Sequence, residues 1–172
     1  MPNIETSYAT GTFTGDGSAV KLECGFTPKK VTMLNSTDAT KLEWFSGMPS
    51  PSAIKTVTVG TQTYETTGHI STWAGDAAGA ALTGTAATTA GSPTLTGTSS
   101  KYLYELRVGD SINVGTATYV VKGVASATSI TLDRPADATA SGVTATRNTG
   151  RGPGFQIGTA ATSAKVFVWI AE

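Results

Sequence analysis

Short runs of β-branched and apolar residues recur along the whole chain, and Gly, Pro, Asn and Asp separate one run from the next. Runs of this kind predict β-strands, and a spacing of about eight to twelve residues is typical of an antiparallel sandwich or barrel. No stretch keeps apolar residues at positions i, i+3, i+4 and i+7 over several turns, so no long helix is predicted. The predicted strands lie near residues 8–14, 18–24, 30–35, 41–46, 54–59, 62–66, 69–73, 94–96, 111–115, 117–124, 129–133, 143–147, 154–157 and 165–171.

The last predicted strand, in KVFVWIAE, is apolar on both of its faces. Val166, Val168 and Ile170 alternate along it with Phe167 and Trp169. Because successive side chains of a strand point to opposite sides, such a strand needs cover on both. We therefore expect it to lie inside a sandwich or against a partner chain.

The chain also changes in composition along its length. The stretch 81–93 is built from small residues with almost no charge, which is typical of a flexible linker. Residues 94–148 carry their own set of apolar positions and predicted strands. We therefore predict an all-β protein in which 1–80 and 149–172 form a discontinuous, antiparallel β-sandwich of jelly-roll type. Residues 94–148 are predicted to be a small inserted β-barrel-like module.

Charge and cysteine content narrow the function. The 172 residues include 12 basic and 12 acidic side chains, without the surplus of Lys and Arg that phosphate binding requires. We therefore expect no nucleic-acid partner. Few charges together with many Thr, Ala, Gly and Ser residues suit a protein packed against neighbours. A single cysteine, no signal-peptide pattern and no long apolar run predict synthesis in a cytoplasm and no membrane partner.

The residues that carry chemistry elsewhere are isolated here. His69 is the only histidine, and Cys24 has no basic neighbour to activate it. Asp110 in VGDSI fits a turn in which the carboxylate caps backbone amides, and Gly15-Asp16-Gly17 fits a hairpin turn. No nucleotide-binding loop, nucleophile elbow or calcium loop occurs. We therefore expect no enzyme activity and no catalytic, cofactor-binding or metal-binding residue.

Four outer segments and one inner segment carry a family resemblance. The outer segments are YATGTFTGDGSAVKLECGFTPKKVTMLN, KLEWFSGM, IKTVTVG and GPGFQIGTAATSAKVFVWIAE. Together they resemble small virion proteins of tailed bacteriophages. The inner segment, TAGSPTLTGTSSKYLYELRVGDSINVGTATYVVKGVASATSITLDRP, is similar to β-modules that recur in phage tail-fibre and other virion proteins.

The resemblance implies a non-enzymatic virion structural protein that needs no cofactor. Its first implication is a capsid decoration, or cement, protein that is made in the host cytoplasm and stabilises the lattice of the major capsid protein at the capsid surface. A homotrimer is expected, because local threefold points of a capsid favour cyclic trimers. The alternative is a tail- or head-fibre module that binds a receptor or a host-surface glycan.

Each hypothesis names candidate residues. For decoration, the segment MPNIETSYATG is the candidate arm for adding a strand to a partner, and the last strand is the candidate trimer seam. For the fibre alternative, the candidates are tyrosines in KYLYEL and in the following β-hairpin. The interface candidates are Ile4, Tyr8, Phe167 and Trp169, and the glycan-facing candidates are Tyr102, Tyr104 and Tyr119.

Overall fold

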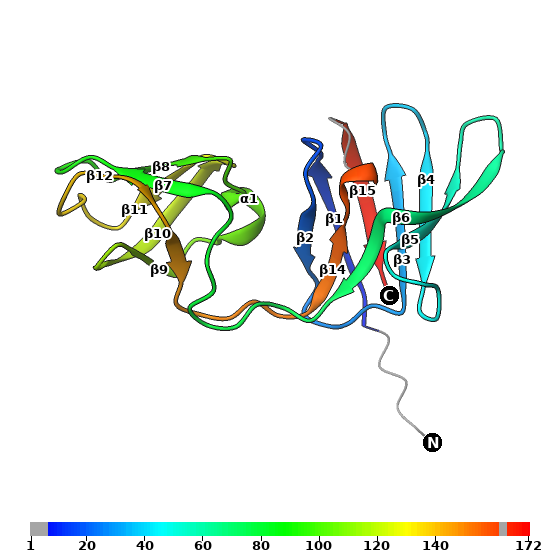
Figure 1. The fold of residues 1–172 in the computed structure, drawn as a ribbon, viewed down its shortest axis with the longest axis horizontal. Helices are drawn as coiled ribbons and strands as arrows, with labels where there is room; N and C mark the ends of the chain where they lie inside the picture. The colour runs from blue at the N-terminus through cyan, green and yellow to red at the C-terminus, as the bar shows by residue number, and fades with distance from the viewer. Residues whose placement is uncertain (1–6, 162–164) are drawn as a thin grey trace, which may run out of the picture. The chain divides into compact units, whose positions relative to one another are not determined.

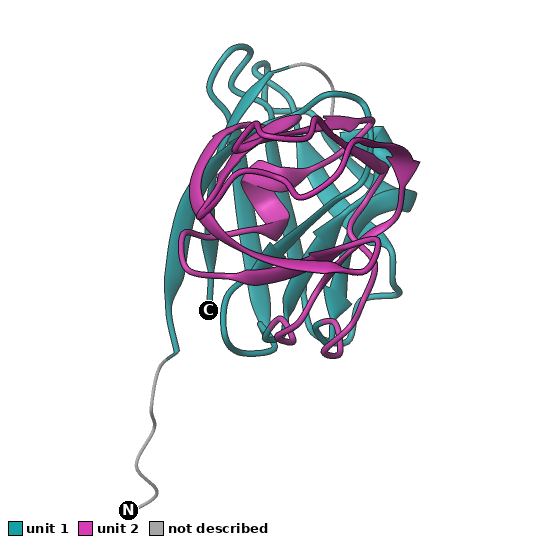
Figure 2. Ribbon diagram, turned by 90° about the vertical axis from the view of Figure 1, so that its left-hand side faces the viewer, with its two compact units in different colours: residues 1–75, 152–172 teal, residues 76–151 magenta. Residues whose placement is uncertain are grey.

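The computed structural model describes residues 7–161 and 165–172. This part of the chain is all-β and antiparallel, as predicted, with fifteen strands, one four-residue α-helix and one short 3-10 helix (Figure 1). The chain divides into two compact units, coloured separately in Figure 2. Unit 1 is Met1–Gly75 with Gly152–Glu172, and unit 2 is Asp76–Arg151. The boundaries thus lie at 75 and 152, where the composition had indicated 80 and 149.

Unit 1 is one eight-stranded sheet in the order β1-β15-β3-β4-β5-β6-β14-β2. The two strands after unit 2 are inserted between strands that precede it, which is why unit 1 needs both ends of the chain. The strands are β1 (Ala9–Thr14), β2 (Val20–Glu23), β3 (Lys30–Asn35), β4 (Lys41–Phe45), β5 (Ser52–Thr56), β6 (Gln62–Trp73), β14 (Gly154–Ile157) and β15 (Val166–Ala171), with the 3-10 helix η1 (Thr159–Ala161) after β14.

Aromatic side chains fill the core of unit 1. Phe155 of β14 meets Trp169 of β15 edge to face, with ring centroids 5.2 Å apart. Strands β3, β4, β5 and β6 separate these two strands in the sheet, so the sheet must curl until its two halves face each other. Phe13 stacks on Phe167 at 4.9 Å. A Cβ at Gly11 would lie 2.7 Å from the Trp169 indole, so only glycine fits opposite that ring.

Unit 2 is a seven-stranded sheet in the order β12-β7-β8-β11-β10-β9-β13. Only Thr144 separates its two edge strands, β12 and β13, in the sequence. Because the chain passes from one edge to the other through one residue, the sheet must curl into a barrel. The elements are β7 (Thr85–Thr88), β8 (Thr94–Thr98), α1 (Tyr102–Glu105), β9 (Ser111–Val114), β10 (Ala117–Ser126), β11 (Ser129–Leu132), β12 (Ala140–Val143) and β13 (Ala145–Arg147).

The segment 81–93 is a part of this barrel, and its prediction as a flexible linker was wrong. It contains β7, which pairs with β8 on one side and β12 on the other. Leu82 and Ala86 are 7% and 2% exposed in the core of unit 2. The small side chains that suggested a linker suit the interior of a narrow barrel, where little volume has to be filled.

Unit 2 replaces the turn of a hairpin in unit 1. Strands β6 and β14 pair antiparallel, and Trp73 and Gly154 are the partners closest to the insertion. At the ends of unit 2, Asp76 and Arg151 form an isolated antiparallel bridge with two backbone hydrogen bonds. Pairing of β6 with β14 therefore closes the interruption in unit 1, and the bridge between Asp76 and Arg151 holds the two ends of unit 2 together.

Candidate functional site

The outward side of unit 1 carries a row of exposed apolar side chains. Val166, Val168 and Ile170 of β15 are 44%, 43% and 36% exposed, and Leu34 of β3 is 44% exposed. Leu34 lies directly opposite Val168 in the sheet, and side chains of such a pair lie on the same face. We call these four residues the apolar outer face. Monomeric proteins seldom leave contiguous apolar side chains uncovered, so a patch of this kind marks an interaction surface.

The surroundings of the apolar outer face are uncharged on one side and charged on the other. Toward the sheet edge, the row meets the exposed threonines of β1, which are Thr10, Thr12 and Thr14. Away from the edge, β4 carries an ion pair between Lys41 and Glu43 at 2.9 Å. The outer surface of β1, β15 and the end of β3 therefore forms one stripe without charge, and a partner must be equally free of unpaired charge.

The two edge strands of this sheet differ. Strand β1 has the sequence ATGTFT, with no charge and no proline, and it pairs only with β15. Strand β2 is shorter and carries Lys21 and Glu23. The Lys21 ammonium lies 5.3 Å from the centre of the Trp73 ring, and the Glu23 carboxylate accepts a 2.7 Å hydrogen bond from Gly152. Short, charged edges resist pairing with other chains, whereas uncharged edges invite it. Strand β1 is therefore the edge open to strand addition.

The interface candidates are only partly on this surface. Tyr8, just before β1, is 63% exposed, and Ile4 lies outside the described residues. Phe167 and Trp169 are 3% and 7% exposed, so they belong to the core of unit 1 and not to a seam with a partner. Both faces of the last strand are apolar, so its sequence could not show which face lies in the core of unit 1. The larger aromatic side chains fill the core, and the smaller aliphatic ones are left outside.

The tyrosines proposed to face a glycan are mostly buried. Tyr102 and Tyr119 are 1% and 3% exposed, which corrects the expectation of exposed rings. Residues 102–105 form a helix, so Tyr102 and the half-buried Tyr104 do not share a strand face. The Tyr102 ring lies close to Gly97, where an added Cβ would be 2.8 Å from it. Burial raises the pKa of the Tyr102 phenol.

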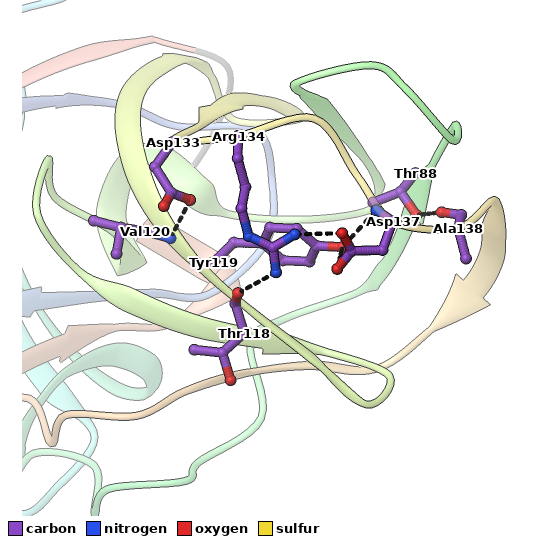
Figure 3. A network of polar contacts seen from close by, with 8 residues as sticks. All are labelled: Thr88, Thr118, Tyr119, Val120, Asp133, Arg134, Asp137 and Ala138. Carbon is purple, nitrogen blue, oxygen red and sulfur yellow. Dashed lines mark hydrogen bonds and ion pairs between the residues drawn. The ribbon is translucent and has the colours of Figure 1, made fainter.

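Tyr119 is the centre of a polar network in unit 2 (Figure 3). The Arg134 guanidinium lies 4.6 Å from the centre of its ring, and Arg134 also binds the Asp137 carboxylate and the Thr118 carbonyl oxygen. The Tyr119 hydroxyl accepts a 3.1 Å hydrogen bond from the Asp137 amide. Asp133 accepts one from the Val120 amide at 2.8 Å. Hydrogen bonding to Arg134 lowers the pKa of Asp137.

This network borders a shallow hollow of about 500 Å³. The side-chain groups at its centre already bind one another, and Arg134 covers the face of the Tyr119 ring that a sugar would need. The network therefore fastens the segment 133–138 to β10, which is a structural role.

Asp110 combines a predicted role with an unpredicted one. Its carboxylate accepts a 2.7 Å hydrogen bond from the Arg107 amide, which confirms the predicted turn. It also accepts a 2.9 Å bond from Arg147, and both side chains of this ion pair are nearly buried. Asp16 likewise caps the Ser18 amide at 2.9 Å. No local pattern could reveal Arg147 as a partner, because it follows Asp110 by 37 positions.

The other polar groups of the described residues form no catalytic constellation. Burial and the nearby Glu23 raise the pKa of the Cys24 thiol to about 11, which leaves it protonated and unreactive near neutral pH. Within 7–161 and 165–172, no three His, Cys, Asp or Glu side chains are placed to share a metal ion. The same residues include no helix long and apolar enough to cross a membrane.

Among the described residues, the apolar outer face and the β1 edge of unit 1 thus form an exposed surface suited to a protein partner. The polar networks of unit 2 have a structural character. Comparisons of the chain with protein-family models, with curated proteins and with solved structures give no match.

Proposed function

We propose that this chain is a non-enzymatic structural protein of a bacteriophage virion, a decoration protein that binds the major capsid protein at the capsid surface. The observation that carries the proposal is the uncharged stripe of unit 1, in which the apolar outer face lies next to the open β1 edge. The sequence resemblance to phage virion proteins points to the same class.

Two kinds of contact are available on this stripe. The apolar outer face can be buried against a second copy, and each large aliphatic side chain covered in this way contributes about 1.5–3 kcal/mol. The β1 edge can accept a strand from the capsid lattice, with main-chain hydrogen bonds providing the affinity. In this proposal, the first contact forms the homotrimer and the second clamps neighbouring capsid subunits.

A charge placed on the apolar outer face tests the proposal. Val168→Lys is expected to turn the trimer into a monomer and to abolish binding to expanded capsids of the phage that encodes the chain. Val59→Lys is the matched control, because Val59 is 85% exposed at a turn in the same unit. Mass photometry or light scattering reports the oligomer, and co-sedimentation reports capsid binding.

The outcomes separate clearly. If Val168→Lys and Val59→Lys both remain trimeric and bind capsids as the wild type does, the apolar outer face is not the interface and the proposal fails. If the wild type is a monomer that no capsid binds, the decoration function fails as a whole. The fibre alternative rests on the sequence resemblance alone, because two of its three glycan-facing candidates, Tyr102 and Tyr119, are buried.

A further inference from the structure

A second hollow lies in unit 1, on the inner side of the sheet and away from the apolar outer face. It has a volume of about 170 Å³ and is lined by residues of β3, β4, β5, β6, η1 and β15 and of the turn after β3. Leu42 and Phe167, both buried, give it an apolar floor. Since one water needs only about 10–15 Å³ of such space, the hollow has room for a small polyatomic ligand.

Lys55 brings an unusual charge into this hollow. It lies opposite the buried Leu42 in the sheet, and its neighbour two positions earlier, Ala53, is completely buried. Because alternate residues of a strand share a side, Lys55 starts on the inner side of the sheet. No hydrogen bond or ion pair joins its ammonium group to another described residue. The carboxylate of Glu65, on the facing strand, binds the Thr63 hydroxyl at 3.0 Å.

His69 contributes a buried imidazole ring, of which one nitrogen is hydrogen-bonded and the other is not. The side chain is 6% exposed, and its Nδ1 lies 2.7 Å from the Thr67 carbonyl oxygen. A carbonyl oxygen only accepts hydrogen bonds, so Nδ1 carries the hydrogen. Nε2 is then the free ring nitrogen, and no described residue binds it.

Asn35 contributes a side-chain amide whose Nδ2 group is available as a hydrogen-bond donor. It is 3% exposed, and its Oδ1 accepts a 2.9 Å hydrogen bond from the Thr37 amide. The two hydrogens of Nδ2 bind no described residue. Nδ2 is not among the fully buried atoms without a partner, so its hydrogens are accessible from the hollow and can be donated to a ligand there.

The remaining charges on the hollow cancel each other. Lys165 binds the Asp38 carboxylate at the rim, and this hydrogen bond, together with one from the Thr40 amide, lowers the pKa of Asp38 to about 2. The pair is therefore neutral near pH 7. Among the charged side chains that line the hollow, Lys55 alone is left uncompensated, which makes the net charge positive.

We propose that this hollow binds a small oxyanion. The ammonium group of Lys55 supplies the charge, the Asn35 amide donates hydrogen bonds, and the free Nε2 of His69 accepts one from a hydroxyl of the anion, such as that of hydrogen phosphate. Phosphate and carboxylate groups share the required chemistry, since both present oxygens that accept charge-assisted hydrogen bonds. The site is independent of the proposed capsid contact, because it lies on the other side of the sheet.

Titration of the full ¹⁵N-labelled chain tests the site, with NMR spectra recorded at constant ionic strength. Sodium phosphate and sodium acetate are added in separate arms, so that a tetrahedral oxyanion is distinguished from a planar one. Saturable shifts are expected for the amide signals of Asn35, Lys55 and His69. If neither anion produces saturable shifts at these positions, the proposal is overturned.

Lys55→Met and Lys41→Met form a matched pair of variants. Lys41 lies on the neighbouring strand, is bound to Glu43 and points to the opposite side. Lys55→Met removes a charge-assisted hydrogen bond and is expected to weaken anion binding about tenfold or more. Lys41→Met keeps that hydrogen bond, so its anion affinity is expected to equal that of the wild type. Equal affinity in the two variants would overturn the assignment of Lys55.

A second readout covers a failure of Lys55→Met to fold. A ligand that binds only the folded state raises its thermal stability. Phosphate is therefore expected to raise the melting temperature of unit 1 relative to chloride in the wild type, and less so in His69→Gln. An equal rise in both proteins contradicts the proposal.

Discussion

The two units of this protein are stabilised by different side chains. Every phenylalanine and every tryptophan lies in unit 1, and every arginine lies in unit 2. In unit 1, ring pairs such as Phe155 with Trp169 fill a wide core. In unit 2, Arg134, Arg147 and Arg151 each bind a carboxylate, and two of them also bind a backbone carbonyl oxygen. A guanidinium group suits this task because its donors form a planar fork.

The comparison shows where each unit can bind a partner. The barrel of unit 2 joins its edge strands through Thr144, so its sheet offers little backbone for pairing. The sheet of unit 1 ends in two separate edges and leaves one of them, β1, without charge. Unit 1 can therefore bind through backbone and apolar side chains.

The largest effect is expected in the aromatic core of unit 1. Trp169→Ala removes a buried ring that packs on Phe155 and Gly11, and losses of this kind cost about 3–5 kcal/mol. Urea unfolding followed by the fluorescence of Trp44 and Trp73 reports on unit 1 alone. Trp169→Phe is the control and should lose much less stability. It keeps an aromatic ring in the core and breaks no hydrogen bond, because the indole Nε1 has no partner among the described residues. The free energy of unfolding of unit 2 should not change. If unit 2 loses as much stability as unit 1, the two units do not unfold independently.

A smaller loss of stability is expected when an arginine–carboxylate ion pair of unit 2 is broken. Arg147→Met leaves the nearly buried Asp110 carboxylate without its partner, and hydrogen bonds to charged groups contribute about 1.5–3 kcal/mol. Circular dichroism and the amide signals of unit 2 measure the change. Lys122→Met is the control, since Lys122 is an exposed cation in the same unit. The double variant Arg147→Met with Asp110→Asn should recover part of the lost stability. If its loss equals the sum of the two single losses, the ion pair does not stabilise unit 2.

The Lys165–Asp38 ion pair of unit 1 should contribute less to stability than the ion pairs of unit 2. Lys165 and Asp38 are each more than a third exposed, so solvent and salt screen their attraction. Since the pKa of Asp38 falls from 3.8 to about 2 on folding, its stabilising effect is complete above pH 4 and lost as the pH falls toward 2. Lys165→Met should raise the pKa of Asp38 partway, as the Thr40 amide still binds it. Carboxyl NMR titration measures this, and an unchanged pKa contradicts the assignment.

The smallest effect is expected from removing unit 2 altogether. Joining Gly75 to Gly152 through Asn-Gly restores the hairpin between β6 and β14, and changes in loop length alter stability by about 0.6 kcal/mol per doubling. Tryptophan fluorescence should show unit 1 unfolding within about 1 kcal/mol of the full chain. Residues 76–151 expressed alone should also fold. Aggregation of both fragments would mean that the units depend on each other.

The strands themselves could be predicted because their signals are local. Alternating side chains and flanking turns placed β3 at 30–35 and β14 at 154–157, and the structure confirms both. The same local chemistry identified the turn at Asp110. The all-β class follows from the same signals, since Thr, Val and Gly disfavour helices wherever they occur along the chain.

Only the tertiary structure decided which side of a strand is buried and which distant residues meet. The pattern of the last strand could not choose between Phe167 and Val168, because that choice depends on the rings of Phe13 and Phe155 from other strands. Within 81–93, Thr85–Thr88 became a strand because β8 and β12 supply its hydrogen-bond partners. Lys55 came to face a hollow because the sheet curls around it. The sequence by itself determined the local periodicity and turns, and the long-range pairing of strands determined the surfaces, since pairing depends on contacts that no short segment contains.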